Sequence, residues 1–227
     1  MATSRTMDEL DYTKERRVIW GPHKFFDGSI IVEILDHEDL DVGLLMRARF
    51  PAGHPLLEMG KDYPQAPPLH LHFDQTESFK VLQGAYGFTT GYDLKDHVIT
   101  ADSPPIHVRP MMPHRPCPVA GQTGRGEDTV VLLWVHPTST DQPLGSTFFT
   151  ELFQVTSDAY EQNKMPPIML LLHAQHRTAS ANVIFPSLTF LGPLRWWIPW
   201  KLQAGVAAIV DLLGYKPLGA AEAKKEL

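Results

Sequence analysis

The chain of 227 residues carries 20 Lys and Arg against 26 Asp and Glu, a formal net charge of −6 at pH 7. Because no basic block is available to neutralise phosphates, this balance excludes nucleic acid as the main partner and favours a small molecule. An apolar fraction of 43% and a charged fraction of 20% are ordinary for a globular protein with a substantial core, and they exclude a disordered chain.

Two features of the sequence bear on the cellular compartment. The opening residues, MATSRTMDELDYTKERR, contain no apolar run of the kind that a secretory signal needs. Cys117 is the single cysteine of the sequence, so an internal disulfide is impossible, which fits a reducing compartment. We therefore expect a cytoplasmic protein.

The first part of the chain divides into a polar arm and a series of short strands. Residues 1–16 are polar and charged without an apolar stripe, and we interpret them as a flexible N-terminal arm or a leader docked on the surface. Strands are predicted at residues 17–20, 29–35 and 43–50, which are rich in β-branched and large apolar residues. In the last of these, Arg47 and Arg49 share one face. That face meets solvent, or else Arg49 reaches an anionic or carbonyl-bearing ligand.

A proline-rich loop precedes the stretch with the clearest chemical signal. Prolines at positions 51, 55, 64, 67 and 68 predict a loop over residues 51–68 that covers one end of the strand assembly. The following stretch reads LHLHFDQTESFKVLQG and occupies residues 69–84. Successive side chains of a strand point to opposite faces, so His70 and His72 share one face.

The same stretch brings a carboxylate towards these histidines. A short turn after Phe73 returns the chain, so that Glu77 can face the same interior as the two imidazoles. Gly84 permits a tight bend at the end of the run. His114 follows after two further strand-like runs and is a fourth candidate for the same site.

The remaining strands complete a β-domain that we assign to residues 17–137. A hairpin is predicted from residues 85–92 and 97–101, and another strand begins at residue 106. The run TVVLLWV at residues 129–135 is apolar throughout, as expected of a strand buried on both faces. About nine short strands joined by turns predict an antiparallel barrel or jelly roll.

Two motifs in this domain resemble those of a known family. His-x-His, four residues, Glu, six residues and Gly is similar to the first motif of the cupin superfamily, and VRPMMPH, which ends at His114, is similar to the second. The resemblance covers roughly residues 44–137. Met111 stands where the family usually has Gly, and Pro118 stands where Asn often follows the histidine. The resemblance implies a small antiparallel β-barrel of the cupin type.

The resemblance also implies a metal centre. Its ligands would be His70, His72, Glu77 and His114. Three imidazoles and one carboxylate suit a divalent ion, and this donor set does not distinguish Fe, Mn, Ni and Zn. An octahedral ion held in this way keeps two positions for water, dioxygen or substrate.

The side chains around this centre predict a hydrophobic or aromatic substrate. The residues expected to bind it are Phe79, Val81, Phe88, Met111 and Trp134. The candidate catalytic groups are His107 and Tyr86, provided that they face inward, and Arg49. We expect a metal-dependent oxygenase or a Lewis-acid isomerase or cyclase. The alternatives are a metal-free cyclase or isomerase that relies on pocket shape and acid/base residues, and a barrel that binds a small molecule without converting it.

The composition changes after Pro137, and residues 138–227 are predicted to form a helical extension packed on the barrel. Apolar residues recur at helical spacing over residues 147–162, and the run 168–176 is a second, nearly all-apolar helix. Its His173 and His176 form a weaker candidate metal pair. Three roles are expected for the aromatic residues near the end of the extension, Trp196, Trp197 and Trp200. They would cap the barrel, contact a second subunit of a homodimer, or make peripheral contact with a membrane.

Overall fold

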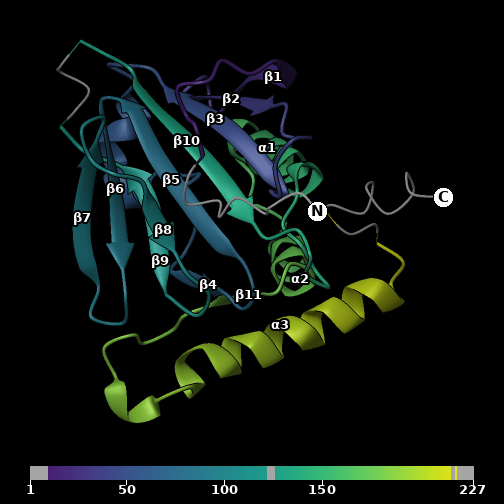
Figure 1. Cartoon of the computed structure of the whole chain (residues 1–227). Helices are drawn as coiled ribbons and strands as arrows, with labels where there is room; N and C mark the ends of the chain where they lie inside the picture. The colour runs from purple at the N-terminus through teal and green to yellow at the C-terminus, as the bar shows by residue number, and fades with distance from the viewer. Residues whose placement is uncertain (1–9, 122–125, 216–217, 219–227) are drawn as a thin grey trace, which may run out of the picture.

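Two antiparallel sheets face each other across the main core of the protein (Figure 1). The structure, a computed structural model, describes residues 10–121, 126–215 and 218. The larger sheet contains, in spatial order, β1 (Val18–Phe25), β2 (Ile30–Leu35), β3 (Leu44–Phe50), β10 (Thr129–His136), β5 (Thr76–Gln83) and β8 (Ile106–Val108). The smaller sheet contains β11 (Ser180–Asn182), β4 (His70–His72), β9 (His114–Pro118), β6 (Ala85–Thr90) and β7 (Lys95–Thr100). The predicted jelly roll of short antiparallel strands is confirmed.

Strand β10 lies at the centre of the larger sheet, between β3 and β5. Its residues 131–135 are all buried, as the apolar run predicted. Val131, Leu133 and Val135 belong to the main core, whereas Leu132 and Trp134 belong to a second apolar cluster. The alternation of the strand therefore divides this run between two separate clusters.

The glycine predicted to bend the chain connects the two sheets. Gly84 separates β5, in the larger sheet, from β6, in the smaller one. Its φ is +73°, and a Cβ at this position would lie 2.6 Å from the Thr129 Oγ1 atom. Glycine therefore suits both the backbone conformation and the close approach of β10.

Two strands include prolines and extend beyond the bounds predicted for them. Strand β1 continues past the expected end at residue 20 through Pro22 to Phe25, and its position at the edge of the sheet explains why a residue without an N–H is tolerated. Strand β9 was expected only as an approach to His114, and it contains two prolines. It pairs with β4 only through His70 opposite His114, so its later residues need few donors on that side.

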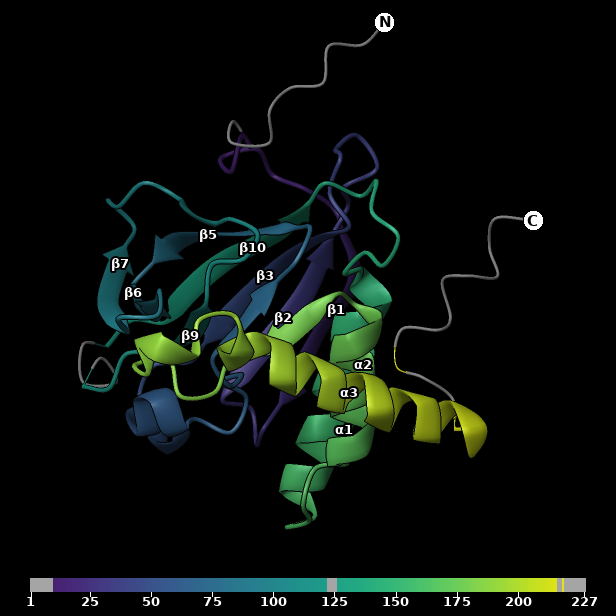
Figure 2. The ribbon, with the colours of Figure 1, turned by 90° about the horizontal axis from the view of Figure 1, so that it is seen from below.

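Three helices follow the barrel. Helix α1 (Ser146–Glu161) and helix α2 (Ile168–Arg177) match the predicted helices to within a residue at each end, and α3 (Leu194–Leu212) lies along one end of the barrel, beside β4 and β11 (Figures 1 and 2). Short 3-10 segments occur at Pro55–Asp62 and Thr189–Leu191. The extension is not all-helical, because β11 adds a strand to the smaller sheet. The division of the chain at residue 137 stays a prediction.

The tryptophans of α3 differ in their surroundings. The rings of Trp196 and Trp200 lie 5.5 Å and 4.7 Å from the ring of Phe73, whereas Trp197 is 44% exposed. Two of the three rings therefore pack on the barrel. Within the described residues, no helix combines the length and the apolar character needed to cross a membrane. The membrane contact, the homodimer and the cytoplasmic location stay predictions.

The predicted N-terminal arm is described only from Leu10, because residues 1–9 lie outside the described residues. Leu10 is buried in the second apolar cluster, together with Trp134. A guanidinium nitrogen of Arg16 lies 2.6 Å from a carboxylate oxygen of Asp39. The described part of this segment therefore packs along the outer face of the larger sheet.

Candidate metal centre

Four buried side chains converge between the two sheets. His70 and His72 come from β4, His114 comes from β9, and Glu77 comes from β5 of the opposite sheet. One potential ligand atom from each residue lies within 4.8 Å of those of the other three. Alternation along β4 points both imidazoles to one face, and the pairing of His70 with His114 adds the third imidazole.

Backbone carbonyl groups set the tautomers of two of these imidazoles. The Nδ1 atom of His70 lies 2.9 Å from the carbonyl oxygen of Pro68, and that of His114 lies 3.2 Å from the carbonyl oxygen of Met112. A carbonyl oxygen can only accept a hydrogen bond, so both Nδ1 atoms carry a proton and donate it. When these rings are neutral, each presents the lone pair of its Nε2 atom to the centre of the cluster.

The carboxylate of Glu77 faces these nitrogen atoms at close range. Its Oε2 atom lies 2.7 Å from His114 Nε2 and 3.4 Å from His72 Nε2. A carboxylate oxygen and an imidazole lone pair repel each other unless a proton or a metal cation lies between them. The His72 Nε2 atom is buried and has no hydrogen-bond partner, since its contact with Glu77 is too long. A divalent cation would satisfy this atom, and three nitrogens with one carboxylate oxygen suit such an ion.

Burial and mutual interaction change the acidity of these groups. Burial would raise the pKa of Glu77, but its interactions with His114 and His72 outweigh burial and hold that pKa well below its usual value. Burial lowers the pKa of His70 well below the usual histidine value, and the neighbouring imidazoles lower it further. Burial also lowers the pKa of His72, against the opposing effect of Glu77. A carboxylate that stays charged beside two imidazoles that stay neutral is the protonation state that metal ligation needs.

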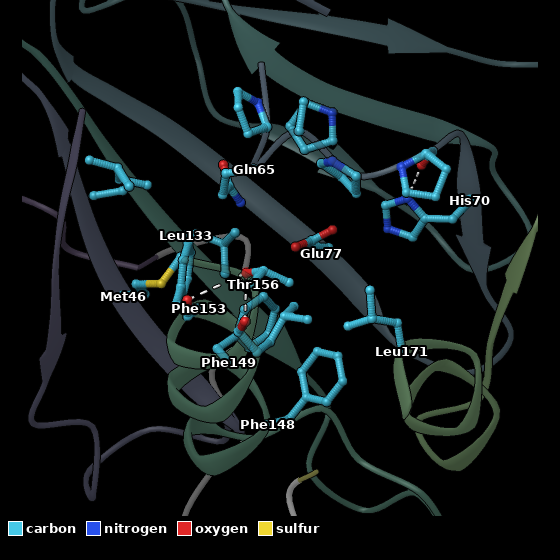
Figure 3. A pocket seen from close by; sticks show the side chains of 18 of the residues that line it. Met46, Gln65, His70, Glu77, Leu133, Phe148, Phe149, Phe153, Thr156 and Leu171 are labelled. Carbon is cyan, nitrogen blue, oxygen red and sulfur yellow. Dashed lines mark hydrogen bonds between the residues drawn. The ribbon is translucent and has the colours of Figure 1, made fainter. Parts of the chain in front are cut away.

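A cavity of about 340 Å³ opens directly beside this cluster. Figure 3 shows His70 and Glu77 on one part of its wall, with Phe148, Phe149 and Leu171 of the helices facing them. The wall is mainly apolar and combines barrel strands, the proline-rich loop after Tyr63 and the C-terminal helices. Among the described residues that line it, only Glu77 and Lys164 have a carboxylate or an ammonium group.

The predicted interior residues fall into two groups. Phe79 and Tyr86 line the cavity. Val81 and Phe88 are buried in the main core behind it and are not part of the lining. Burial raises the pKa of Tyr86 well above its usual value, so its hydroxyl keeps its proton at neutral pH. Tyr86 is therefore placed as a possible hydrogen-bond donor to a ligand, and its catalytic role stays a prediction.

The expected inward position of His107 and Trp134 is wrong. Their rings lie 6.0 Å apart, Trp134 belongs to the second apolar cluster beneath Leu10, and neither residue lines the cavity. Ser78, the neighbour of Glu77 in β5, pairs with His107 on one side and with Trp134 on the other. The side chains of these three residues therefore lie on the same face of the larger sheet. Since successive side chains alternate, this face is the one opposite to Glu77.

Two further assignments are corrected by the structure. Arg49 does not enter the cavity, because half of its side chain is exposed and it forms an ion pair with Asp128 at 3.4 Å. Met111 is also outside the cavity and 39% exposed. Its φ of +65° is in the left-handed region that favours glycine, and its N–H donates to the carbonyl oxygen of His72 at 2.7 Å. Met111 thus retains a backbone conformation suited to the glycine that the motif usually has.

Several residues of the cavity were not predicted from the sequence. The largest group comes from α1 and includes Phe148, Phe149, Leu152, Phe153 and Tyr160. Their helical spacing predicted a packed helix, but no sequence signal indicates that it packs against the mouth of a barrel. Ser180 of β11 also lines the cavity and lies 2.8 Å from His72. A strand of three residues carries too little pattern to be predicted.

The weaker histidine pair on α2 does not form a metal cluster with a third ligand among the described residues. The Nε2 atom of His173 lies 3.0 Å from a carboxylate oxygen of Asp211 in α3, and Arg177 binds the other oxygen of that carboxylate. The ring of His176 lies 4.2 Å from the ring of Trp200. These contacts join α2 to α3, so the pair is explained by helix packing.

The two-sheet antiparallel barrel and the three histidines and one glutamate held between its sheets are the fold and the donor set that the resemblance to the cupin superfamily implied. No protein-family model matches the chain. It is 33% identical to oxidoreductase iacF of Pestalotiopsis fici over 151 residues, which are 65% of this chain and 69% of that protein. The chain therefore belongs to the same family as oxidoreductase iacF.

The chain is also similar to other known proteins. The chain is 26% identical to the probable oxidoreductase virH of Hypocrea virens over 198 residues, 84% of this chain and 81% of that protein. Among solved structures, it is similar to the cupin domain of Schizosaccharomyces pombe Cnp3 (TM-score 0.35, 14% identity, 49% of this chain and 66% of that one). It is also similar to a predicted oxalate decarboxylase of Thermotoga maritima (TM-score 0.34, 17% identity, 47% and 78%). These TM-scores are low, so the fold assignment rests on the topology and the four side chains.

Proposed function

We propose that the protein is a metal-dependent oxidoreductase that acts on a small, uncharged and largely apolar organic substrate. The observation that carries this proposal is the opening of the four-residue cluster into an apolar cavity. A structural metal has little use for an adjoining cavity of about 340 Å³, whereas a reaction centre needs one. The names of the relatives, oxidoreductase iacF and probable oxidoreductase virH, support redox chemistry in preference to isomerisation.

The residues that would hold the metal are His70, His72, Glu77 and His114. Bound there, a redox-active divalent ion such as Fe would supply electron transfer and a Lewis-acid site for a substrate oxygen. The donor set does not select among Fe, Mn, Ni and Zn.

The side chains of the cavity would bind the substrate and exclude water from it. The aromatic side chains Phe79, Phe148 and Phe149 line the cavity and would hold an apolar ring by contact area. The Tyr86 hydroxyl retains its proton and can donate a hydrogen bond to a substrate oxygen. Lys164, three residues after the end of α1, is exposed, with its ammonium group 2.7 Å from the side-chain oxygen of Gln162. Because no buried cationic side chain among the described residues lines the wall, an anionic group away from the metal would lose its hydration without compensation.

The corrected positions of two residues weaken the metal-free alternative. A metal-free cyclase or isomerase was expected to use Arg49, Tyr86 and His107, and only Tyr86 lines the cavity. A metal-dependent isomerase and a barrel that only binds its ligand share the same site, and the experiment below separates them from an oxidoreductase.

The test begins with protein purified from medium without added metal, in which the metal content is measured by mass spectrometry. The metal-free protein is then loaded under anaerobic conditions with Fe(II), Mn(II), Ni(II) or Zn(II) and exposed to dioxygen with a panel of uncharged phenols and enols and their carboxylated analogues. We expect dioxygen consumption with a redox-active ion and an uncharged compound only. Isomerisation of the same compounds with Zn(II) would instead establish a Lewis-acid isomerase.

Variants identify the site. His72→Ala removes a ligand and should abolish turnover, whereas Ser157→Ala removes a buried hydroxyl of α1 that does not line the cavity and should retain it. Full turnover in the His72→Ala protein would refute metal catalysis at this cluster. Binding of the apolar compounds without conversion under every metal would support the non-catalytic barrel.

A further inference from the structure

The C-terminal extension places one hydroxyl against the metal-binding histidine pair. Strand β11 pairs with β4 so that Ser180 lies directly opposite His72. The Oγ atom of Ser180 is 2.8 Å from the Nδ1 atom of His72, and the two residues are 3% and 5% exposed. This contact joins positions that are 108 residues apart in the sequence.

The surrounding hydrogen bonds show which of the two groups donates. The Ser180 hydroxyl lies 3.0 Å from the carbonyl oxygen of Thr178, which can only accept, so its single hydrogen is used there. The Thr178 hydroxyl donates to the carbonyl oxygen of Ala174 at 3.0 Å and is 3.4 Å from the Ser180 hydroxyl. The Ser180 oxygen is therefore left as an acceptor, and the Nδ1 atom of His72 must carry a proton and donate it.

We propose that Ser180 is a positioning residue of the metal centre, which holds His72 in the tautomer that directs its Nε2 lone pair towards the centre of the cluster. His70 and His114 obtain the same tautomer from backbone carbonyl groups within two residues of each. His72 obtains it from a side chain that the extension supplies. The inference rests on the proposed function insofar as it assigns this lone pair to a metal.

A buried network of amide side chains holds Ser180 in place. Gln203 of α3 is almost completely buried, and its side-chain nitrogen donates to the Ser180 carbonyl oxygen at 3.2 Å. The same nitrogen donates at 3.1 Å to the side-chain oxygen of Gln175 in α2, and Gln175 exchanges two hydrogen bonds with Asn182 of β11. Helices α2 and α3 thus position β11, and β11 positions a ligand of the barrel.

The proposal has a consequence for the role of the extension. Inward histidines fixed by their own strand would need no helices to complete the site. Here a hydrogen-bonded path runs from Gln203 through Ser180 to His72, so a change in the packing of α3 should alter the imidazole as well as the stability of the fold.

The test compares the full-length wild type with Ser180→Ala, Ser180→Thr and Ser157→Ala. Ser157 is the matched control, because its buried hydroxyl accepts from the Phe26 N–H at 2.7 Å and donates to Glu161 at 2.8 Å, away from the cluster. The first readout is the tautomer of His72 in metal-free protein, measured by long-range proton–nitrogen NMR. The second is the affinity for Co(II), measured by competition with a chelator.

We expect His72 of the wild type to be protonated at Nδ1 alone, and that of Ser180→Ala to be a mixture of tautomers. Co(II) affinity should fall about tenfold to a hundredfold in Ser180→Ala, as is typical when a residue that supports a metal ligand is removed. Ser180→Thr retains the hydroxyl and should recover most of that affinity. Ser157→Ala should lose thermal stability without loss of Co(II) affinity.

The two readouts separate this inference from the proposed function. A wild-type His72 that carries no proton on Nδ1 in the metal-free protein would overturn the role of Ser180, and this measurement needs no variant to fold and no metal to bind. Equal Co(II) affinity in Ser180→Ala and wild type would overturn it as well, while leaving the metal centre intact. Failure of the wild type to bind any divalent ion, with the expected tautomer present, would reject the proposed function and leave the positioning of His72 by Ser180 standing.

Discussion

The Nε2 atom of His114 and the Oε2 atom of Glu77 approach to 2.7 Å across the space between the two sheets. His114 is completely buried, and its Nδ1 proton is donated to a backbone carbonyl. The remaining nitrogen therefore faces a carboxylate with a proton or a cation between them. Because His114 belongs to the smaller sheet and Glu77 to the larger one, the distance between these two atoms depends on how the sheets pack.

Replacement of Glu77 by Gln tests the anionic ligand. The amide keeps the size of the side chain but removes its charge, so affinity for Zn(II) should fall by more than about 100-fold, beyond the loss expected for a supporting residue. Chelator competition measures this affinity. Glu33→Gln is the control, because Glu33 is ion-paired with Arg47 on the larger sheet at 2.6 Å and should bind Zn(II) as the wild type does.

Metal removal should lower the thermal stability of the wild type but not that of His72→Ala. An ion that binds only the folded state stabilises it by about 2.7 kcal/mol at a free concentration of 100 Kd. For a chain of this length, that corresponds to a rise in Tm of roughly 5–10 °C. Calorimetry with Zn(II) and then with excess chelator measures the shift. An equal, reversible shift in His72→Ala would place the ion elsewhere.

The wall of the cavity can be tested separately from the metal. Phe149→Ala removes an aromatic side chain from the lining and should weaken binding of 1-naphthol, an uncharged aromatic probe, by about tenfold. Trp134→Phe changes a residue of the second apolar cluster and should leave this binding unchanged within twofold, on the order of experimental error. Isothermal titration calorimetry measures both. A loss in Trp134→Phe equal to that in Phe149→Ala would contradict the position of the cavity.

Met111→Gly should stabilise the protein. A side chain in the left-handed conformation costs about 1–2 kcal/mol, and glycine removes this cost in exchange for a larger entropy in the unfolded chain. We expect a net gain of about 0.5–1 kcal/mol in the free energy of unfolding, measured by urea denaturation. Met112→Gly is the control, since no positive φ is assigned to Met112, and it should be neutral or destabilising.

The contact between Arg16 and Asp39 predicts a pH effect at the surface. The hydrogen bond that Asp39 accepts from Arg16 lowers the pKa of the Asp39 carboxyl from 3.8 to about 2. Because the folded state has the lower pKa, the stabilisation is present above pH 3.8 and is lost as the pH falls towards 2. NMR titration of the Asp39 carboxyl measures the midpoint, which should return towards 3.8 in Arg16→Ala. An unchanged midpoint in that variant would show that residues 10–16 do not pack as described.

Local rules of strand geometry were sufficient to predict much of the candidate site. The two-residue period of a strand puts His70 and His72 on one face, wherever the strand lies in the fold. Gly84 is required where the chain leaves one sheet for the other. These two relationships depend on neighbouring residues, so the sequence alone determines them. Glu77 reaches the histidines from the opposite sheet, so its position also depends on how the two sheets pack.

Tertiary structure decided which face of each strand is the interior. In β10, Leu133 and Trp134 are apolar neighbours on opposite faces, and Trp134 packs with Leu10 and other apolar residues in a separate cluster on the outer face. The alternation of side chains along a strand predicts which residues share a face, but it does not predict which of the two faces is buried in the barrel. Trp134 and His107 were therefore assigned to the wrong side.

The partner of His72 also depended on the complete fold. Three residues of β11 carry no periodic signal, and nothing in the sequence connects Ser180 with a histidine 108 positions earlier. Their contact exists because α2 and α3 pack against β11, which pairs with β4. A local pattern can present the candidate metal ligands, but the hydrogen bond to one of them requires the long-range packing of the folded chain.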